Sequence, residues 1–262
     1  MAKRPLSSVE LAPLALATAV VIANGYYIHP IIARIAEDFD VSASTIGLVP
    51  AFNQLALALG IFLLLPLGDR FSNRRLISVF VAGQFVGVTI MAFAADFQWF
   101  AAGSTLLGFF TIAPYLLPSY ASKRVDPGQL GHVTAMLTTG VLMGILLARS
   151  GAGVIGEYLG WRTVYYLAAA LMLVMAFLLP LIMEEDETPR EAGETLSYPA
   201  LLLSMGSVVA RHPEVLVSGA IQGLSFGLFL ATWLALSLHL TSPEMGYGVD
   251  VVGYLSLLAI FN

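Results

Sequence analysis

The turn at residues 68–75 carries the most concentrated charge between two apolar runs of the chain. It reads Gly-Asp-Arg-Phe-Ser-Asn-Arg-Arg, so five of its eight residues are Gly, Asp or Arg. A carboxylate at such a boundary is expected to accept hydrogen bonds from a helix N-terminus or from an arginine. A purely topological role would explain the arginines but not Asp69. We therefore predict a specific ion pair for Asp69.

A second charge, Arg149, lies inside the apolar run at residues 132–155. A charged side chain within a membrane span is costly and is a functional-site hypothesis by default. The alternative is that Arg149 extends to the outer interface, because it lies in the outward third of its run. Both interpretations stay open at this point. No Asp or Glu lies inside the first seven apolar runs, so no carboxylate there could carry a proton or bind a cation.

Signatures of enzymes are missing from the sequence. There is no glycine-rich phosphate loop, no nucleophile elbow and no metal-spaced His/Glu cluster. The four histidines fall at different membrane depths, and the chain has no cysteine. We therefore expect no enzymatic activity, no cofactor and no metal site. The basic residues form no patch, so we expect no nucleic-acid partner.

The elements that must position these residues are membrane helices. Hydrophobic residues make up 58% of the chain, charged residues 11%, and the mean hydropathy is +0.84. This small fraction of charged residues cannot cover the surface of a soluble protein. The lipid bilayer must therefore be one partner of the protein. The sequence predicts an all-α membrane protein with apolar runs at 11–32, 45–67, 76–95, 99–119, 132–155, 161–183, 215–238 and from 251 to the last residue.

The basic residues predict the orientation. With the N-terminus in the cytoplasm, nine Lys and Arg residues lie inside, two lie outside and Arg149 lies within a span. This bias follows the positive-inside rule. We expect a multi-pass protein of the cytoplasmic (inner) membrane with a cytoplasmic N-terminus.

An acidic, polar stretch at 184–194 divides the chain. It is followed by the apolar but short stretch 198–211, which predicts an amphipathic helix on the cytoplasmic face. We predict three parts: a six-helix bundle at 1–183, a cytoplasmic linker at 184–213, and the start of a second bundle at 214–262, with a seventh helix and an incomplete eighth.

Glycines in the fifth run predict a packing face. Gly140, Gly144 and Gly151 are spaced four and seven residues apart and therefore share one side of a helix. Small residues at such spacing let helices approach closely in lipid. We expect all three to contact a neighbouring helix.

Uncharged polar residues within the runs predict a binding cavity. Each could simply bond to a neighbouring helix, which is the alternative for any one of them. As a set with two tyrosines they outline an uncharged cavity that would suit a neutral polar or amphipathic solute. The candidates for this cavity are Asn24, Tyr27, Asn53, Gln54, Tyr115 and Gln222.

The loop from Leu67 to Arg75 resembles the signature loop of the major facilitator superfamily. The stretch at 24–30 resembles the end of the first span in its efflux branch of sugar and drug exporters. Further matches lie in the fifth span and the turn after it, at Gly140, Gly144, Arg149, Gly153 and Gly160-Trp161-Arg162. Several positions depart from the family pattern. Leu65 replaces a glycine, Ser72 or Asn73 replaces a later glycine of the loop, Ser104 replaces an arginine of proton-coupled exporters, and Leu130 replaces an arginine before Gly131.

The resemblance implies two six-helix bundles, a central cavity and alternating access. It also implies a charged cytoplasmic gate formed by Asp69, Arg70 and Arg74, with Asp126 as a candidate partner within this half. The implied function is secondary active transport of a small organic solute, sugar- or drug-like, in the direction of efflux. Protons are a candidate coupling ion, although Ser104 argues against the family's usual route. The alternative is a truncated or degenerate fragment, or an assembly partner, that transports nothing by itself.

Overall fold

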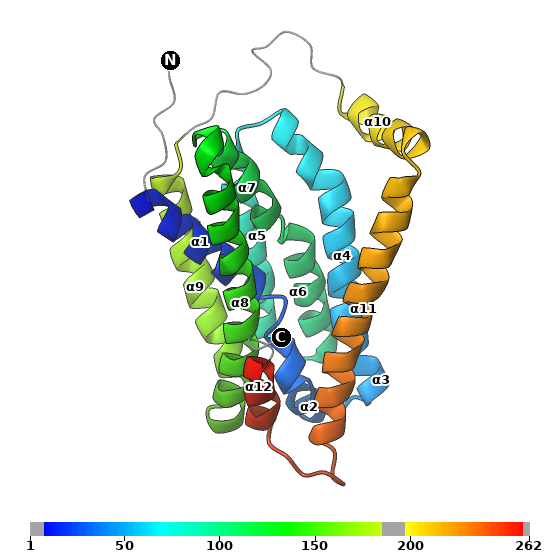
Figure 1. Cartoon of the computed structure of the whole chain (residues 1–262). Helices are drawn as coiled ribbons and strands as arrows, with labels where there is room; N and C mark the ends of the chain where they lie inside the picture. Colours follow the sequence, from blue (N-terminus) through cyan, green and yellow to red (C-terminus); the bar gives the residue numbers. More distant parts are fainter. Residues whose placement is uncertain (1–7, 185–196, 259–262) are drawn as a thin grey trace.

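The structure of the chain is a computed structural model that describes residues 8–184 and 197–258 (Figure 1). The described residues form helices and no β-strand. Seven helical stretches are long and apolar enough to cross a membrane. The prediction of an all-α membrane protein is therefore confirmed. Lys3, Arg4, Arg190, the acidic stretch at 185–196 and the end of the eighth run lie outside the described residues.

The described residues of the first six spans and their connections form nine α-helices and two 3₁₀ helices. The first, second and fourth spans each consist of more than one helical piece. The elements are α1 (Ser8–Ala23), α2 (Ile28–Asp38), α3 (Ala43–Ile46), α4 (Leu48–Leu64), η1 (Leu65–Asp69), α5 (Asn73–Ala92), α6 (Phe97–Phe110), α7 (Ala113–Ser122), η2 (Pro127–Gln129), α8 (Leu130–Tyr158) and α9 (Trp161–Ile182).

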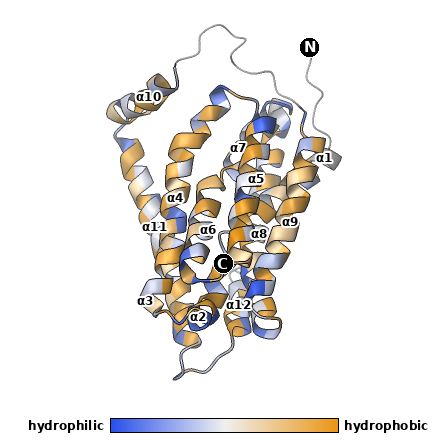
Figure 2. Cartoon of the chain, turned by 180° about the vertical axis from the view of Figure 1, so that it is seen from behind, coloured by the Kyte–Doolittle hydropathy of each residue, from blue (hydrophilic) through white to orange (hydrophobic). Residues whose placement is uncertain are grey.

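Three further helices follow the linker. They are α10 (Tyr198–Arg211), α11 (Glu214–Leu240) and α12 (Val249–Leu258). The bundle has two ends. We call the end that carries η1 and α10 the linker end, and the end that carries Asp38, Tyr158 and the loop at 241–248 the far end (Figure 1). Hydrophobic residues dominate the length of the spans, and hydrophilic residues concentrate near both ends (Figure 2). The division at 183 and 213 stays a prediction.

Polar residues cap the helices where the sequence changes from loop to apolar run. The Ser42 hydroxyl accepts a hydrogen bond from the Thr45 backbone N–H, the Ser72 hydroxyl accepts from Arg75, and Asp96 accepts from Trp99. Such caps satisfy donors that a helix leaves free at its N-terminus. Ser72 thereby fixes the start of α5 directly after the charged turn.

The first span is interrupted at residues 24–27 and then continues as α2. Pro30 is the third residue of α2, where a missing N–H costs no helical hydrogen bond. The sequence predicted that this span ends near Ile32, which is wrong, because α2 runs to Asp38. The fourth span is interrupted in the same manner between Phe110 and Ala113.

Glycines allow the closest helix contacts. A Cβ atom at Gly108 would lie 2.2 Å from the Asn53 backbone oxygen, and one at Gly60 would lie 2.2 Å from that of Phe109. The backbones of α4 and α6 therefore touch directly. This packing replaces the hydrophobic driving force that lipid does not supply between helices.

The linker helix α10 lies across the linker end rather than along the spans (Figure 1). None of its described residues is buried. The Tyr198 hydroxyl donates a 2.5 Å hydrogen bond to the Leu63 backbone oxygen at the end of α4. One side chain thus ties the linker helix to the second span next to the charged turn.

Candidate functional site

Arg149 lies near the middle of the bundle, on the side that faces α11. It is nine residues from the end of α8, or about 14 Å along the helix axis. Its side chain is buried, with 1% of its surface exposed. The alternative that Arg149 extends to the interface is therefore wrong.

The surroundings of Arg149 come from three elements. Its Nε donates a 3.3 Å hydrogen bond to Nδ1 of His29 at the start of α2. The guanidinium carbon lies 5.2 Å from the centre of the Tyr26 ring, in the break of the first span. It lies 4.7 Å from the ring centres of both Phe229 and Trp233 on α11. Three aromatic rings and a histidine therefore enclose this cation.

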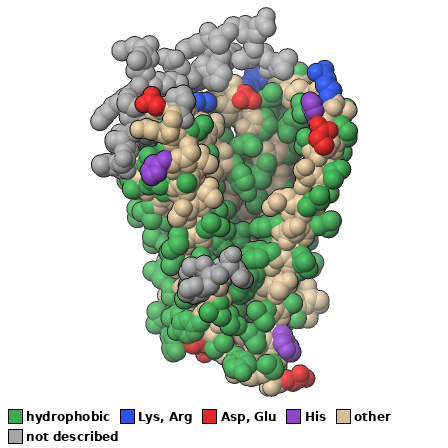
Figure 3. All heavy atoms as spheres, in the orientation of Figure 1, with side chains coloured by type: hydrophobic (Ala, Val, Ile, Leu, Met, Phe, Trp, Pro, Cys, Tyr) green, Lys and Arg blue, Asp and Glu red, His purple; other side chains and the backbone are tan. Residues whose placement is uncertain are grey.

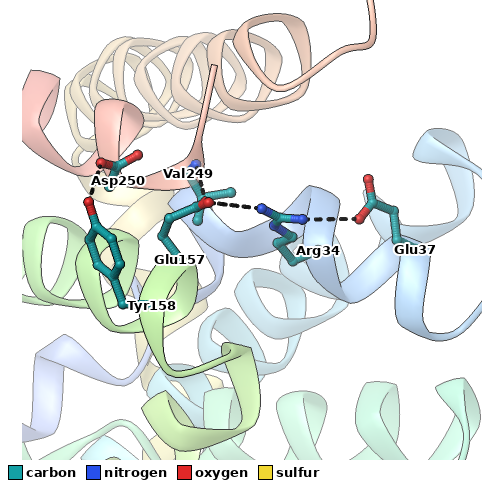
Figure 4. Close-up of polar contacts among 6 residues, drawn as sticks. All are labelled: Arg34, Glu37, Glu157, Tyr158, Val249 and Asp250. Carbon is teal, nitrogen blue, oxygen red and sulfur yellow. Dashed lines mark hydrogen bonds and ion pairs between the residues drawn. The ribbon is translucent and has the colours of Figure 1, made fainter. Parts of the chain in front are cut away.

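The far end carries a polar network that joins the first bundle to α12 (Figure 4). The Glu157 carboxylate accepts hydrogen bonds of 3.0 and 3.1 Å from Arg34 and one of 3.1 Å from the Val249 backbone N–H. The Tyr158 hydroxyl lies 3.5 Å from the Asp250 carboxylate. The sequence analysis missed this network, since Arg34 was counted only as an orienting charge.

A glycine contact lies beside this network. A Cβ atom at Gly153 on α8 would lie 2.9 Å from the Gly253 Cα on α12 and 2.7 Å from the Val249 backbone oxygen. The two helices therefore meet backbone to backbone. The Ser237 hydroxyl of α11 donates a 3.2 Å hydrogen bond to the Pro30 backbone oxygen. The far end is thus closed by contacts of both α11 and α12 with the first bundle.

The linker end is open between α11 and the first bundle. Figure 3 shows a hollow on this face beside α11, with hydrophobic side chains on its walls. The described residues of α11 from Glu214 to Phe229 are all exposed. Contacts between α11 and the bundle therefore concentrate toward the far end.

The structure places the predicted gate residues at the linker end. Asp69 ends η1 and is exposed, Arg70 and Arg74 are partly buried, and Asp126 is exposed. Among the residues that the structure describes, no ion pair joins any two of these four. Within the described residues of this half, Asp69 therefore forms no ion pair in this conformation, and its gate role stays a prediction.

A different ion pair lies at the linker end and was missed from the sequence. Arg124 has only 4% of its side chain exposed, and its Nη1 lies 2.6 Å from a carboxylate oxygen of Glu184. The guanidinium also lies 4.8 Å from the centre of the Tyr120 ring. The Tyr120 hydroxyl accepts a hydrogen bond from the Glu184 backbone N–H. This cluster fixes the end of the sixth span against the fourth.

The six predicted cavity residues do not form one hydrogen-bonded group. The Asn24 amide donates to the Val20 and Val21 backbone oxygens, and the Asn53 amide donates to the Ser104 backbone oxygen at 2.7 Å. Asn53 thus joins α4 to α6. No hydrogen bond within the described part of the chain links any two of Asn24, Tyr27, Asn53, Gln54, Tyr115 and Gln222.

The other cavity candidates are spread over several surfaces. Tyr27 lines an apolar groove of about 470 Å³ between α1, α8 and α9. Gln54 is partly buried on α4, Tyr115 is 42% exposed on α7, and Gln222 is exposed on α11. A common cavity for these residues stays a prediction about the whole protein.

The predicted packing face on α8 needs one correction. A Cβ atom at Gly140 would lie 2.5 Å from the Ala15 backbone oxygen, and one at Gly144 would lie 2.4 Å from that of Ala19. At Gly151 no described atom of another element lies within 4 Å of such a Cβ. The packing expected of Gly151 is therefore wrong, because α1 ends at Ala23, four residues beyond Ala19, and Gly151 lines the apolar groove instead.

The fold and this site define a class of protein: a multi-pass α-helical membrane protein whose first six spans form one bundle that meets two further helices at one end. A sequence profile of the Major Facilitator Superfamily matches residues 14–262. The chain belongs to this family, which is a family of transporters. The resemblance stated from the sequence is confirmed.

Relatives with similar sequences include one transporter described as uncharacterized and two whose names state a substrate class. The "Uncharacterized transporter YgaY" of Escherichia coli O157:H7 is 34% identical over 250 residues, which are 95% of this chain and 62% of that protein. The "Multidrug efflux pump LfrA" of Mycolicibacterium smegmatis is 27% identical, over 84% of this chain and 45% of that protein. The "D-xylose transporter" of Levilactobacillus brevis is 30% identical, over 78% and 45%. The chain thus spans about three fifths of the length of YgaY and less than half of the length of the other two proteins.

Solved structures agree on the fold. A bacterial homolog of the human lysosomal transporter Spinster, described as inward-facing and unoccupied, aligns with a TM-score of 0.71 at 17% identity. The alignment covers 97% of this chain and 60% of that one. At this identity the likeness defines the fold alone.

Proposed function

We propose that the protein is a secondary active transporter that moves a small organic solute across the cytoplasmic membrane by alternating access. The observation that carries this proposal is the uneven contact between the first bundle and α11 with α12. Glu157, Val249, Gly153 and Gly253 join them at the far end, whereas α11 is exposed toward the linker end. A transporter that opens to one side at a time needs such an asymmetry.

The linker end is the cytoplasmic end in this proposal. Of the basic residues at the ends of the described helices, six lie at the linker end and two, Arg34 and Arg162, lie at the far end. The six are Arg70, Arg74, Arg75, Lys123, Arg124 and Arg211. This distribution follows the positive-inside rule and supports a cytoplasmic N-terminus. The conformation is then open to the cytoplasm and closed toward the outside.

The charged turn acts in the opposite conformation. Asp69, Arg70 and Arg74 stand at the rim of the open end, where they would meet groups of the second bundle when that end closes. Charge-assisted hydrogen bonds suit a gate that must form and break in each cycle. Asp126 stays a candidate partner on the same rim.

The solute class follows from the relatives. A multidrug efflux pump and a D-xylose transporter among them support a sugar- or drug-like solute, and the efflux pump supports export. Protons stay a candidate for the coupling ion.

The test is solute uptake into everted vesicles that contain the full-length protein. Labelled D-xylose and the fluorescent dye fluorescein serve as probes, each with and without a pH gradient. We expect uptake of at least one probe to exceed that of an Asp69→Asn variant at least tenfold. Equal uptake by both proteins for both probes would contradict the proposal.

A further inference from the structure

The Arg149 guanidinium differs from other arginines that the structure places in contacts. Arg34 has the Glu157 carboxylate at 3.0 Å, Arg124 has Glu184 at 2.6 Å, and Arg162 pairs with Asp38. Arg149 is more deeply buried than any of these three arginines. Within the described residues, no carboxylate pairs with it. Aromatic ring faces and a histidine nitrogen contact the Arg149 guanidinium in place of an anion.

One nitrogen of this guanidinium has no hydrogen-bond partner among the described residues. Its Nη2 is buried and makes no hydrogen bond to any part of the chain that is described. Arginine keeps its charge in proteins, and an unpaired buried charge is strongly unfavourable. The acid nearest along α8 is Glu157, eight residues or about 12 Å farther along the helix, and it is bound to Arg34. The site therefore has donor capacity and positive charge that the first bundle does not neutralise.

The cover over Arg149 belongs to the second part of the chain. Phe229 and Trp233 are on α11, whereas Arg149, His29 and Tyr26 belong to the first bundle. Phe229 is 39% exposed, whereas the Arg149 guanidinium that it contacts is buried. If α11 moves with the second bundle during alternating access, its two rings leave the guanidinium and uncover it.

We propose that Arg149 binds the carboxylate of the transported solute, so that the solute is an organic acid. This inference rests on the proposed transport function and names the chemistry of its solute. The planar guanidinium fork matches a carboxylate through two parallel hydrogen bonds. A single positive charge balances a single negative one, and no second Lys or Arg lies in the middle of an apolar run. The site therefore favours a carboxylate over a phosphate dianion and replaces the neutral solute that the uncharged polar set predicted.

The rings around Arg149 complete the selection. Tyr26, Phe229 and Trp233 offer apolar faces to the body of the solute, while Arg149 offers a positive charge. A sugar acid or an aromatic acid fits this combination. The neutral analogue would leave the guanidinium unpaired in the occupied site, and a site with an unpaired polar group rejects such analogues.

The experiment measures ligand binding to the purified full-length protein with two matched pairs of probes. Benzoate is compared with benzamide, and D-glucuronate with D-glucose, by calorimetric titration and by the fluorescence of Trp233 in a variant without the other tryptophans. We expect at least one acid to bind at least tenfold more tightly than its neutral partner. Arg149→Gln should weaken binding of that acid at least tenfold, because a hydrogen bond to a charged group is lost.

Two further variants keep the test sharp if Arg149→Gln fails to fold. Arg149→Lys keeps the charge but loses the fork, and it should bind the acid with an affinity between those of the wild type and Arg149→Gln. Arg211→Gln removes an exposed arginine of α10 and should bind as the wild type does. Binding of both acids with the same affinity as their neutral partners, or binding of neither acid by the wild type, would overturn the proposal.

The acid site and the transport function can fail independently of each other in these tests. An Arg149→Gln variant that moves solute into vesicles at the wild-type rate would overturn the acid site and leave the transporter intact. A wild-type protein that binds acids through Arg149 but moves no solute would leave the site intact and overturn transport.

Discussion

Gly153 of α8 and Gly253 of α12 lie back to back, so that a Cβ atom on Gly253 would come within 3.2 Å of the Gly153 Cα. The same Cβ would lie 3.0 Å from the Ser150 backbone oxygen. A Cβ atom at Gly153 would lie 2.7 Å from the Val249 backbone oxygen and would force a shift, and one at Gly253 would require its neighbours to move by a few tenths of an ångström. Because α8 belongs to the first bundle and α12 follows the linker, the distance between these two glycines indicates whether the far end is closed.

A bulky residue at Gly253 should open the far end. Overpacking a tight contact costs about 1–3 kcal/mol, which corresponds to roughly a tenfold shift or more between closed and open states. The reporter is a Val249→Cys substitution, chosen because Val249 is 1% exposed in the closed conformation. The 262 residues contain no cysteine, so the reporter adds the only thiol of this segment. Gly253→Leu should speed maleimide labelling of this cysteine about tenfold.

The matched control for this prediction is Gly223→Leu on α11. Gly223 has no described atom within 4 Å of a Cβ position, so the same substitution should leave labelling at the parent rate. If both leucine variants label equally, the glycine contact does not hold the far end closed.

Neutralising Glu157 should loosen the same closure by a smaller amount. Glu157→Gln keeps an acceptor for the Val249 N–H but loses the charge that attracts Arg34. Arg34 is 45% exposed, so solvent screening limits the effect to about 1 kcal/mol or less. We expect labelling of the Val249→Cys reporter to rise up to about fivefold, and the rise should shrink in high salt.

Glu37→Gln provides the comparison for the Glu157 variant. Glu37 lies 3.8 Å from Arg34 and is 68% exposed. Its neutralisation should change the labelling rate little. A larger effect at Glu37 than at Glu157 would show that the network of Figure 4 does not close the far end.

Two glycines on one helix should differ in their tolerance of valine. Gly144→Val places its Cβ 2.4 Å from the Ala19 backbone oxygen and should force α1 and α8 apart at a cost of about 1–3 kcal/mol. Gly151→Val enters open space and should cost much less. The measurement is the midpoint temperature at which the full-length protein loses its monodisperse peak in detergent. Equal midpoints for the two variants would contradict this account of the packing.

Neutralising Asp69 should abolish transport and spare insertion. Asp69→Asn removes the charge with which the turn would close the linker end, so uptake should fall at least tenfold while the amount of protein in the membrane stays the same. Asp40→Asn is a matched control at the far end, where the backbone has a positive φ of 51° that asparagine tolerates well. Normal transport by the Asp69 variant would rule out the gate role.

The spans and the family could be predicted from the sequence because both depend on local properties. Runs such as 161–183 and 215–238 are long and apolar whatever surrounds them, and α9 and α11 follow them closely. The open surroundings of Gly151 could not be predicted, because helical spacing places it on the face of Gly144 but does not reveal that α1 ends at Ala23, before it reaches Gly151. The far-end network was equally hidden, since Glu157 and Arg34 are 123 positions apart in the chain.

The sequence by itself determined that the chain is an all-α membrane protein of a transporter family, and that a charge, Arg149, lies inside an apolar run. Long apolar runs indicate membrane helices, because backbone polar groups in a bilayer must be satisfied within the protein, and the resemblance of the loop from Leu67 to Arg75 indicates the family. Only the tertiary structure decided which groups surround that charge. Contacts such as those of Arg149 with His29 and Trp233 join helices distant in the chain, and their geometry depends on how the helices cross, which no local pattern encodes.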